Sequence, residues 1–147
     1  MGSCKAKVVE SDGNKVKLDK TVFYAFSGGQ ASDKGSIAGI TVVQAEKQDS
    51  TIEYELESEP GFKVGDEVGI EIDMDHRKRI MALHSAAHIV YEFARKHLGE
   101  KLIGSNVSED KARLDFAYDG SIGEFLPGIE DEVNAFIAEN HEVLTYA

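Results

Sequence analysis

The sequence predicts an α+β protein in which a small antiparallel β-barrel is followed by a region of helices and strands. Two periodicities lead to this fold class. Before residue 74, apolar and polar residues alternate in short stretches separated by turns that contain glycine, as in half-buried strands of a barrel. After residue 74, apolar residues recur every three or four positions, as on one face of a helix. We therefore expect a barrel over residues 1–73 and a second unit over residues 74–147.

Four stretches carry the clearest strand pattern. Residues 5–8 and 15–18 flank the turn sequence Ser-Asp-Gly-Asn at residues 11–14, and this arrangement predicts a hairpin. Residues 51–57 and 67–73 alternate strictly between apolar and polar side chains. Such a strand buries one face and exposes the other to water.

The second unit is expected to begin with a long helix that ends before Gly99. The apolar stripe of this helix consists of Ile80, Leu83, Ala87, Val90, Ala94 and Leu98. Residues 111–118 alternate and predict a strand. Ser121 and Glu124 then match a capping box for a second helix, although Pro127 lies within its pattern. The expected buried face of that helix comprises Ile122, Phe125, Leu126, Ile129, Val133, Phe136 and Ile137, and a last strand is expected from Val143, Leu144 and Tyr146.

Composition points to a soluble globular protein. Hydrophobic residues make up 41% and charged residues 29% of the 147 residues, as in ordinary folded domains. No apolar stretch is long enough to span a bilayer, and the chain does not open with a signal peptide. Cys4 is the only cysteine, so no internal disulfide forms. We therefore expect a cytoplasmic protein of undetermined oligomeric state.

Charge is unevenly distributed along the chain. The net charge of −11 argues against a general nucleic-acid binder. Residues 1–45 and 76–108 are nevertheless net positive, whereas residues 46–75 and 109–147 are strongly acidic. Most of these charges are expected on solvated faces. Both motifs that carry chemistry, however, fall in the positive stretches.

His84 and His88 lie four residues apart on the expected helix, so both imidazoles share one face and can bind one metal ion. The alternative is a pair of histidines at a polar edge of the helix. Zinc needs more than two protein ligands; Cys4 has suitable chemistry for a third, but it lies at the start of the other unit. The remaining histidines, His76, His97 and His141, are expected at the surface.

The second motif, Ser27-Gly28-Gly29-Gln30, follows an apolar stretch at residues 22–26 that is expected to be a strand. Adjacent glycines let a backbone approach a ligand closely, and the Gln30 amide both donates and accepts hydrogen bonds. The alternative is a glycine hairpin or bulge. The motif is not a phosphate loop, because no Gly-Lys-Ser/Thr follows and no helix opens.

Together these segments resemble the alanyl-tRNA synthetase family. Residues 23–35, Phe-Tyr-Ala-Phe-Ser-Gly-Gly-Gln-Ala-Ser-Asp-Lys-Gly, resemble the motif Phe-Tyr-Pro-Glu-Gly-Gly-Gly-Gln-Pro-x-Asp-x-Gly of these synthetases and their free-standing editing relatives. Residues 79–90 resemble the family's Arg-x-x-x-x-His-Thr-Ala-x-His segment, and residues 104–107 and 113–116 match the stretch after it. The resemblance covers essentially the whole chain.

This resemblance implies a small barrel followed by a two-layer α/β editing domain, here incomplete at its C-terminus. It implies an aminoacyl-tRNA deacylase that hydrolyses the ester between serine or glycine and the tRNA for alanine. By position, His84 and His88 correspond to zinc ligands, and Gln30 and Ser105 to residues of the catalytic pocket. We therefore expect Gln30 beside the two histidines, and a mischarged tRNA acceptor end as the partner.

Departures from the family pattern bear on activity. Ala25, Phe26, Ser27 and Ala31 replace Pro, Glu, Gly and Pro in the glycine-rich motif. The family's later Cys-x-x-x-His, which supplies the other two zinc ligands, is absent, so we expect a fragment that binds zinc weakly. One alternative is a non-catalytic module that contributes RNA contacts or packing. Another is a threonyl-type editing domain, which shares the paired histidines but not the preceding Gly-Gly-Gln.

Basic residues near the motifs predict a path for RNA. They are Lys34, Arg77, Lys78, Arg79, Arg95, Lys96 and Lys101. Phosphates that enter the pocket must pass such groups, because the acidic remainder of the chain repels them. We therefore expect weak, strongly salt-dependent tRNA binding through these side chains. The alternative is that Arg77 and Arg79 pair with Asp73 and Asp75 and hold the junction between the two units.

Overall fold

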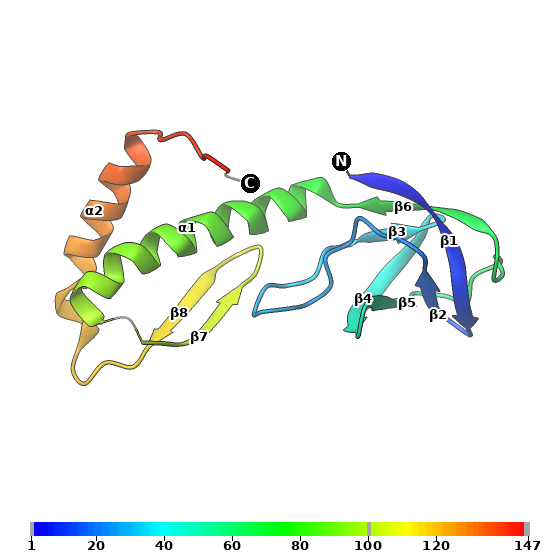
Figure 1. The fold of residues 1–147 in the computed structure, drawn as a ribbon, viewed down its shortest axis with the longest axis horizontal. Coiled ribbons are helices and arrows are strands. Elements are labelled where there is room, and N and C mark those ends of the chain that lie inside the picture. Colours follow the sequence, from blue (N-terminus) through cyan, green and yellow to red (C-terminus); the bar gives the residue numbers. More distant parts are fainter. Residues whose placement is uncertain (1, 100, 146–147) are drawn as a thin grey trace.

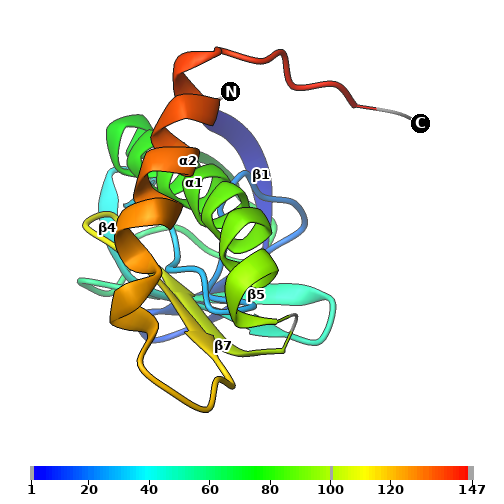
Figure 2. The same ribbon diagram turned by 90° about the vertical axis from the view of Figure 1, so that its left-hand side faces the viewer.

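The computed structural model describes residues 2–99 and 101–145, and these residues form an elongated molecule (Figure 1). A closed barrel occupies one end, helix α1 (Met74–Leu98) leads away from it, and helix α2 (Leu126–Ala138) lies at the other end (Figures 1 and 2). No helix in the described ranges is long and apolar enough to cross a membrane. The predicted α+β class is confirmed.

The barrel closes six antiparallel strands. They are β1 (Ser3–Asp12), β2 (Lys15–Leu18), β3 (Gly35–Ile37), β4 (Ile40–Gln48), β5 (Thr51–Leu56) and β6 (Glu67–Ile72). Their order around the barrel is β1-β2-β5-β4-β3-β6, and pairing of β6 with β1 completes the closure. Closure removes exposed sheet edges. The predicted hairpin is β1–β2, and the predicted strands at residues 51–57 and 67–73 are β5 and β6.

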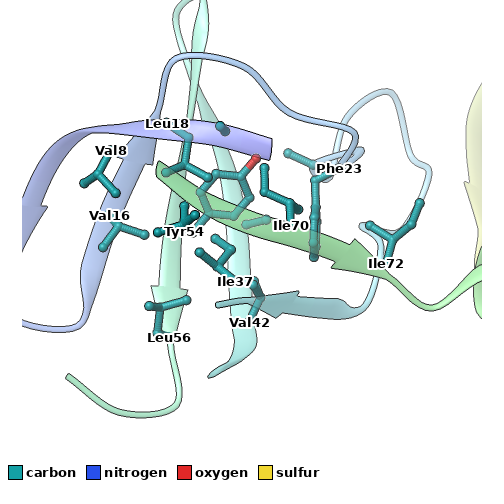
Figure 3. Packing of buried hydrophobic residues seen from close by; sticks show 14 residues of the cluster. Val8, Val16, Leu18, Phe23, Ile37, Val42, Tyr54, Leu56, Ile70 and Ile72 are labelled. Carbon is teal, nitrogen blue, oxygen red and sulfur yellow. The ribbon is translucent and has the colours of Figure 1, made fainter. Parts of the chain in front are cut away.

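Side chains from alternate positions of the strands fill the barrel (Figure 3). Ile37 and Ile70 are fully buried there. Tyr54 packs edge-on against Phe23 with ring centroids 5.5 Å apart, and its hydroxyl donates to Thr21 Oγ1 at 2.5 Å. Burial raises the pKa of Tyr54 to about 12. The tyrosine is therefore a core residue whose single polar group is satisfied within the barrel.

Residues 22–26 are not a strand, which corrects the sequence prediction. A single-residue bridge joins Phe26 to Glu46 of β4. The backbone N–H of Tyr24 donates instead to the Asp33 carboxylate, at 2.6 Å from Oδ2. Because a side chain takes this donor, a regular ladder does not form along the segment. The following loop therefore leaves the barrel and extends beneath α1 (Figure 1).

Helix α1 confirms the predicted long helix. The Asp73 carboxylate caps its N-terminus by accepting from the N–H groups of Asp75 and His76, each at 2.9 Å, and these bonds lower the pKa of Asp73. Gly99, with φ of 83°, ends the helix in a conformation that favours glycine. In the predicted stripe, Ile80, Ala87, Ala94 and Leu98 are buried and Leu83 and Val90 are half-buried.

A two-stranded sheet packs against α1. Strand β7 (Leu102–Val107) pairs with β8 (Ala112–Phe116) in antiparallel fashion, and β8 confirms the strand predicted over residues 111–118. A single 3-10 turn (Ile122–Glu124) then precedes α2. Ala94 and Leu98 of α1 meet Ile129 and Val133 of α2 in a small core. In the second unit, α1 therefore packs against both the hairpin and α2, and Phe116 of β8 joins the core that the two helices share.

Two predictions for residues 121–147 fail, and a third holds only in part. Ser121 makes no side-chain capping bond to the 3-10 turn, and α2 starts only at Leu126, because Pro127 fits the first helical turn, where its missing N–H is not needed. Residues 141–145 form no strand; Tyr146 lies outside the described residues. Of the expected apolar face, Ile129 and Val133 are buried, whereas Ile122, Leu126, Phe136 and Ile137 stay exposed because no described segment covers them.

The glycine-rich loop joins the two units through its backbone. Val107 N–H donates to Gly29 O, and Ala31 N–H donates to Val107 O, each at 2.8 Å. These bonds make Gln30 a parallel neighbour of Val107 on β7. The loop thus joins the end of β7 through a single-residue bridge, which fixes it against the second unit.

A charged pair holds the same loop to the start of α1. The Asp33 side chain is almost completely buried and accepts from Arg77 Nε at 2.6 Å and from Arg77 Nη2. Arg77 Nη2 also donates to Val22 O at 2.8 Å. A buried carboxylate needs such partners, because burial without them is strongly unfavourable. The Arg77–Asp33 pair therefore locks the barrel, the loop and the helix together.

The docking of the loop predicts unequal effects of two glycine substitutions. Gly28 (φ 57°) and Gly29 (φ 81°) both have positive φ, but a Cβ on Gly29 would lie 2.4 Å from Ser105 O, while one on Gly28 meets nothing within 4 Å. Gly28→Ala should cost about 1–2 kcal/mol of left-handed strain. Gly29→Ala should cost more and speed hydrogen exchange of the Val107 amide, measured by NMR. Equal losses and unchanged exchange in both variants would contradict the docking.

The buried Asp33–Arg77 pair predicts that its loss costs much more stability than the loss of an exposed pair. Asp33→Ala should lower the free energy of unfolding by about 3–5 kcal/mol, because the Arg77 guanidinium and the Tyr24 N–H both lose their carboxylate acceptor. Glu67→Gln is the control, since Glu67 and Lys5 form an exposed pair at 2.9 Å, and it should change stability little. Urea unfolding followed by circular dichroism measures both. A similar small loss in the two variants would show that Asp33 is not the structural anchor.

Candidate functional site

A pocket of about 280 Å³ lies where the glycine-rich loop, α1 and β7 meet. Its volume is near the lower end for small-molecule sites. It is lined by Gly28, Gln30, His84, Ala87, His88, Tyr91, Leu102, Ser105, Val107 and Leu114. The molecule has other hollows of similar size, on the barrel wall and beside α2. This one differs from those two because it gathers histidine side chains, His84 and His88, beside Gln30.

All four predicted site residues line this pocket. Gln30 comes from the barrel loop, His84 and His88 from α1, and Ser105 from β7. The prediction that Gln30 lies beside the two histidines is confirmed, although 54 residues separate Gln30 from His84. The catalytic and metal-binding roles of the four residues stay predictions.

Chain geometry explains why Gln30 meets His84. From Asp33 back to Gln30, the extended loop advances about 10 Å at roughly 3.3 Å per residue. From Arg77 forward to His84, the helix also advances about 10 Å at 1.5 Å per residue. Because Asp33 and Arg77 are paired and the two advances match, this pair sets the register of the contact between Gln30 and His84.

The Gln30 amide orients the first imidazole. Gln30 Oε1 accepts a hydrogen bond from His84 Nδ1. Since an amide oxygen only accepts, the hydrogen of a neutral His84 ring lies on Nδ1 and a lone pair lies on Nε2. Nε2 of His84 is 3.1 Å from Nε2 of His88, and the rings stack with centroids 5.0 Å apart. The lone pair on Nε2 of His84 therefore faces Nε2 of His88. A hydrogen or a cation placed between the two nitrogens would stabilise this arrangement.

The two imidazoles fit one half of a zinc site. Zinc binds histidine nitrogens at about 2.0–2.1 Å, so two nitrogens of a tetrahedral site are roughly 3.4 Å apart. The 3.1 Å between the Nε2 atoms of His84 and His88 is close to this separation. The orientation of His84 by Gln30 is also the kind of outer contact that metal-binding histidines use.

The other half of a zinc site is not found in the described ranges. Within residues 2–99 and 101–145, no three His, Cys, Asp or Glu side chains gather as a metal site. Cys4 pairs with Ile70 across β1 and β6 and packs on the barrel core, so it does not reach the histidines. The chemical suitability of Cys4 as a third ligand therefore has no geometric counterpart.

Ser105 brings a hydroxyl to the pocket from the opposite side. It sits on β7 opposite Leu114 of β8, and its exposed side chain faces the pocket. The backbone of Gly29 passes directly over Ser105 O, an approach that a side chain on Gly29 would block. Glycine at position 29 therefore allows the Gln30 amide and the Ser105 hydroxyl to share one small space.

His76 is buried, with 3% of its surface exposed, which corrects its predicted surface position. Its Nδ1 lies 2.6 Å from Glu109 Oε2, and its Nε2 lies 3.1 Å from Ser32 O. The ring therefore bridges the glycine-rich loop and the turn between β7 and β8. The sequence held a signal for this, because His76 precedes Ile80 by four residues and so belongs to the same buried stripe.

Glu109 collects three nitrogen partners at the rim. Its carboxylate contacts Lys34 Nζ at 2.7 Å, His76 Nδ1 at 2.6 Å and Arg79 Nη2 at 3.2 Å. Hydrogen bonds from Lys34 above all, then from His76 and Arg79, lower the pKa of Glu109 to about 2. The carboxylate therefore remains charged in all but strongly acidic solution and links the loop, the helix and the hairpin turn.

The structure gives Arg77 and Arg79 other partners than Asp73 and Asp75, which were the alternative to RNA contact for these two arginines. Arg77 pairs with Asp33, and Arg79 with Glu109, because the loop and the hairpin turn bring these acids closer than the cap residues Asp73 and Asp75. The inference that such pairs hold the junction is nevertheless correct. Near the other end of the helix, Arg95 contacts Glu92 at 2.8 Å, and Lys96 lies 3.9 Å from Glu132.

Comparison with known proteins gives consistent relatives. The family described as tRNA synthetases class II (A) matches residues 1–76. The alanyl-tRNA editing protein AlaX-M of Pyrococcus horikoshii is 36% identical over 143 residues, which are 95% of this chain and 66% of that protein. The AlaX-M of Methanosarcina mazei is 36% identical over 147 residues, covering 92% and 59%. The alanine–tRNA ligase of Sulfurisphaera tokodaii is 40% identical over 146 residues, covering 94% of this chain and 16% of the ligase.

The matches to the three relatives run across both units of the molecule, since each covers more than 90% of this chain. The chain spans about three fifths to two thirds of the length of the editing proteins that it matches, at 59% to 66%. The ligases and the editing proteins thus share with this chain the region that builds the barrel, the loop and the paired histidines. The chain belongs to the alanyl-tRNA synthetase editing-domain family.

Proposed function

We propose that this chain is an aminoacyl-tRNA deacylase unit that hydrolyses the ester between serine or glycine and the tRNA for alanine. The observation that carries the proposal is the contact between Gln30 of the barrel loop and His84 of α1 inside one small pocket. Two distant chain segments meet there with complementary polar groups. The names of the editing relatives supply the substrate class.

The side chains divide the work of binding. Gln30 uses its amide oxygen for His84, so its two amide hydrogens are directed to a substrate carbonyl or hydroxyl. Ser105 offers a hydroxyl that pairs with the serine side chain of a mischarged tRNA. The pocket walls of Ala87, Val107 and Leu114 exclude water around a small amino acid. Alanine, which lacks the hydroxyl, leaves this polar group unpaired and is bound less well.

His84 and His88 are the residues that would hold zinc, through their Nε2 atoms. Bound zinc supplies a Lewis acid for the ester carbonyl or an activated water. Gln30 then acts on the metal site indirectly, by keeping the His84 hydrogen on Nδ1. Because two imidazoles are too few for tight binding, further ligands have to come from outside the described residues.

The non-catalytic alternative has one observation in its favour. In the part of the chain that the structure describes, no third metal-binding side chain stands beside the histidines. A unit of this kind can still hold the acceptor end and leave hydrolysis to other residues. Hydrolysis and tRNA binding must therefore be measured separately.

The direct test is deacylation of seryl-, glycyl- and alanyl-tRNA for alanine by this chain, with and without added zinc. Hydrolysis of seryl-tRNA should exceed that of alanyl-tRNA, because only serine has the hydroxyl that pairs with Ser105, and it should rise with zinc. His84→Ala and Gln30→Ala should lower the rate about 10- to 100-fold, whereas His97→Ala, an exposed histidine on the same helix, should not. Background hydrolysis with zinc present, alongside intact tRNA binding, would favour the non-catalytic alternative.

Glu109 predicts a pH dependence of stability. Its pKa lies near 2 in the folded chain and near 4.5 ordinarily, so its stabilising contribution is full above pH 4.5 and is lost as pH falls toward 2. Glu109→Gln should therefore lower the unfolding midpoint in urea at pH 7, and the difference from wild type should shrink below pH 4.5. Asp110→Asn, at the exposed neighbour, is the control. A difference that is constant with pH would contradict the cluster.

A further inference from the structure

The glycine-rich loop has a second face, turned away from the histidines, with a hollow of about 350 Å³. The hollow is lined by Phe26, Ser32, Gln44, Ala45, Glu46 and Lys47. Phe26 is 59% exposed, although the bridge to Glu46 fixes its backbone on the barrel. An exposed aromatic ring on a fixed backbone, beside a hollow, is a surface on which a base can stack.

The polar groups around the ring select a particular kind of base. Gln44 Nε2 donates to Glu46 Oε1 at 2.5 Å, which places an amide and a carboxylate side by side. Carboxylates accept from the exocyclic amine of cytosine, and glutamine pairs with adenine. The unpaired end of a tRNA, CCA, contains only these two bases. Uracil has no exocyclic amine to offer to Glu46.

Charge also fixes which side of a nucleotide faces β4. Gln44 and Glu46 lie opposite Glu55 and Glu53 of β5. Lys15 pairs with Glu53 at 3.1 Å, but Glu46 and Glu55 leave this surface net negative, so it favours base edges over phosphates. Lys47 lies at the border of the hollow and offers a cation to the backbone. The nucleotide therefore lies with its base edge on β4 and its phosphate outward.

The two hollows are close enough to serve one RNA end. Phe26 and Ser32 line the outer hollow, whereas Gly28 and Gln30 line the pocket. Four residues of chain span at most about 14 Å, and the turn that links Ser27 to Gln30 by two backbone bonds shortens this distance. A short single strand that stacks on Phe26 therefore reaches the histidine pocket.

We propose that Phe26, with Gln44 and Glu46, forms a stacking site for one amine-bearing unpaired base of the tRNA acceptor end. This inference rests on the proposed function, because it assumes that the aminoacyl ester lies at His84. In the related motif the position of Phe26 carries glutamate, which stacks poorly and repels RNA. The site is therefore a property of this chain that the motif does not predict.

Tryptophan fluorescence tests the site directly. The sequence contains no tryptophan, so Phe26→Trp supplies a single reporter, and Val43→Trp, at an exposed residue of β4, is the control. Uncharged tRNA for alanine at low salt should quench the first reporter and not the second. A tRNA without its CCA end should quench neither. Equal quenching by both tRNAs would overturn the proposal.

Affinity supplies the second readout. Phe26→Leu, which keeps an apolar side chain without the aromatic ring, should weaken binding of uncharged tRNA about 5- to 100-fold. Phe26→Tyr and Val43→Ala should bind as wild type does, and thermal melting of each variant checks its fold. Wild-type affinity in Phe26→Leu, or no tRNA binding by the wild type, would also overturn the proposal.

These measurements separate the two proposals because uncharged tRNA is not a substrate. CCA-dependent quenching without any deacylation would retain the stacking site and reject the hydrolase. Deacylation with unchanged KM and affinity in Phe26→Leu would retain the hydrolase and reject the stacking site.

Discussion

The buried pair of Asp33 and Arg77 is the contact on which the rest of the molecule depends. Strand β6 ends at Ile72 and α1 begins at Met74, so the covalent connection alone leaves the helix free to pivot on the barrel. The Asp33 carboxylate, almost excluded from water, requires the guanidinium. Because Gln30 and His84 lie about equally far along the loop and the helix from this pair, the ion pair sets how the two segments line up at the pocket, and the backbone bonds to β7 and the Glu109 contacts then hold them there.

Local patterns predicted much of the fold, and long-range contacts account for the failures. Alternation identified β5 and β6, and the apolar stripe identified α1, because each element buries one regular face. Residues 22–26 carry the same apolar signal but form no ladder, since the Asp33 carboxylate takes the backbone N–H of Tyr24. The exposed apolar residues of α2 show the same limit, because periodicity reports a face suited to burial, not whether a partner covers it.

The candidate site was predictable where a motif carried it. The paired histidines and the glycine-rich loop were found in the sequence, and the resemblance brought them together. His76 was misplaced because a histidine alone does not reveal a distant partner such as Glu109, which is 33 residues away. For the same reason, cations expected to be open to RNA, Lys34 and Arg79, are held by Glu109 at the rim. Contact with phosphates therefore has to compete with this carboxylate.

Through Gln30, the barrel loop sets the position of the hydrogen on a helix histidine, His84, in a pocket that both units line. The position of the hydrogen on the His84 ring, measured by nitrogen-15 NMR at mildly alkaline pH without metal, tests this role of Gln30 most directly. The hydrogen should lie on Nδ1 in the wild type, because Gln30 Oε1 accepts it, and should move largely to Nε2 in Gln30→Ala. A His84 ring with its hydrogen on Nε2 in the wild type, or one that Gln30→Ala does not change, would contradict the shared pocket.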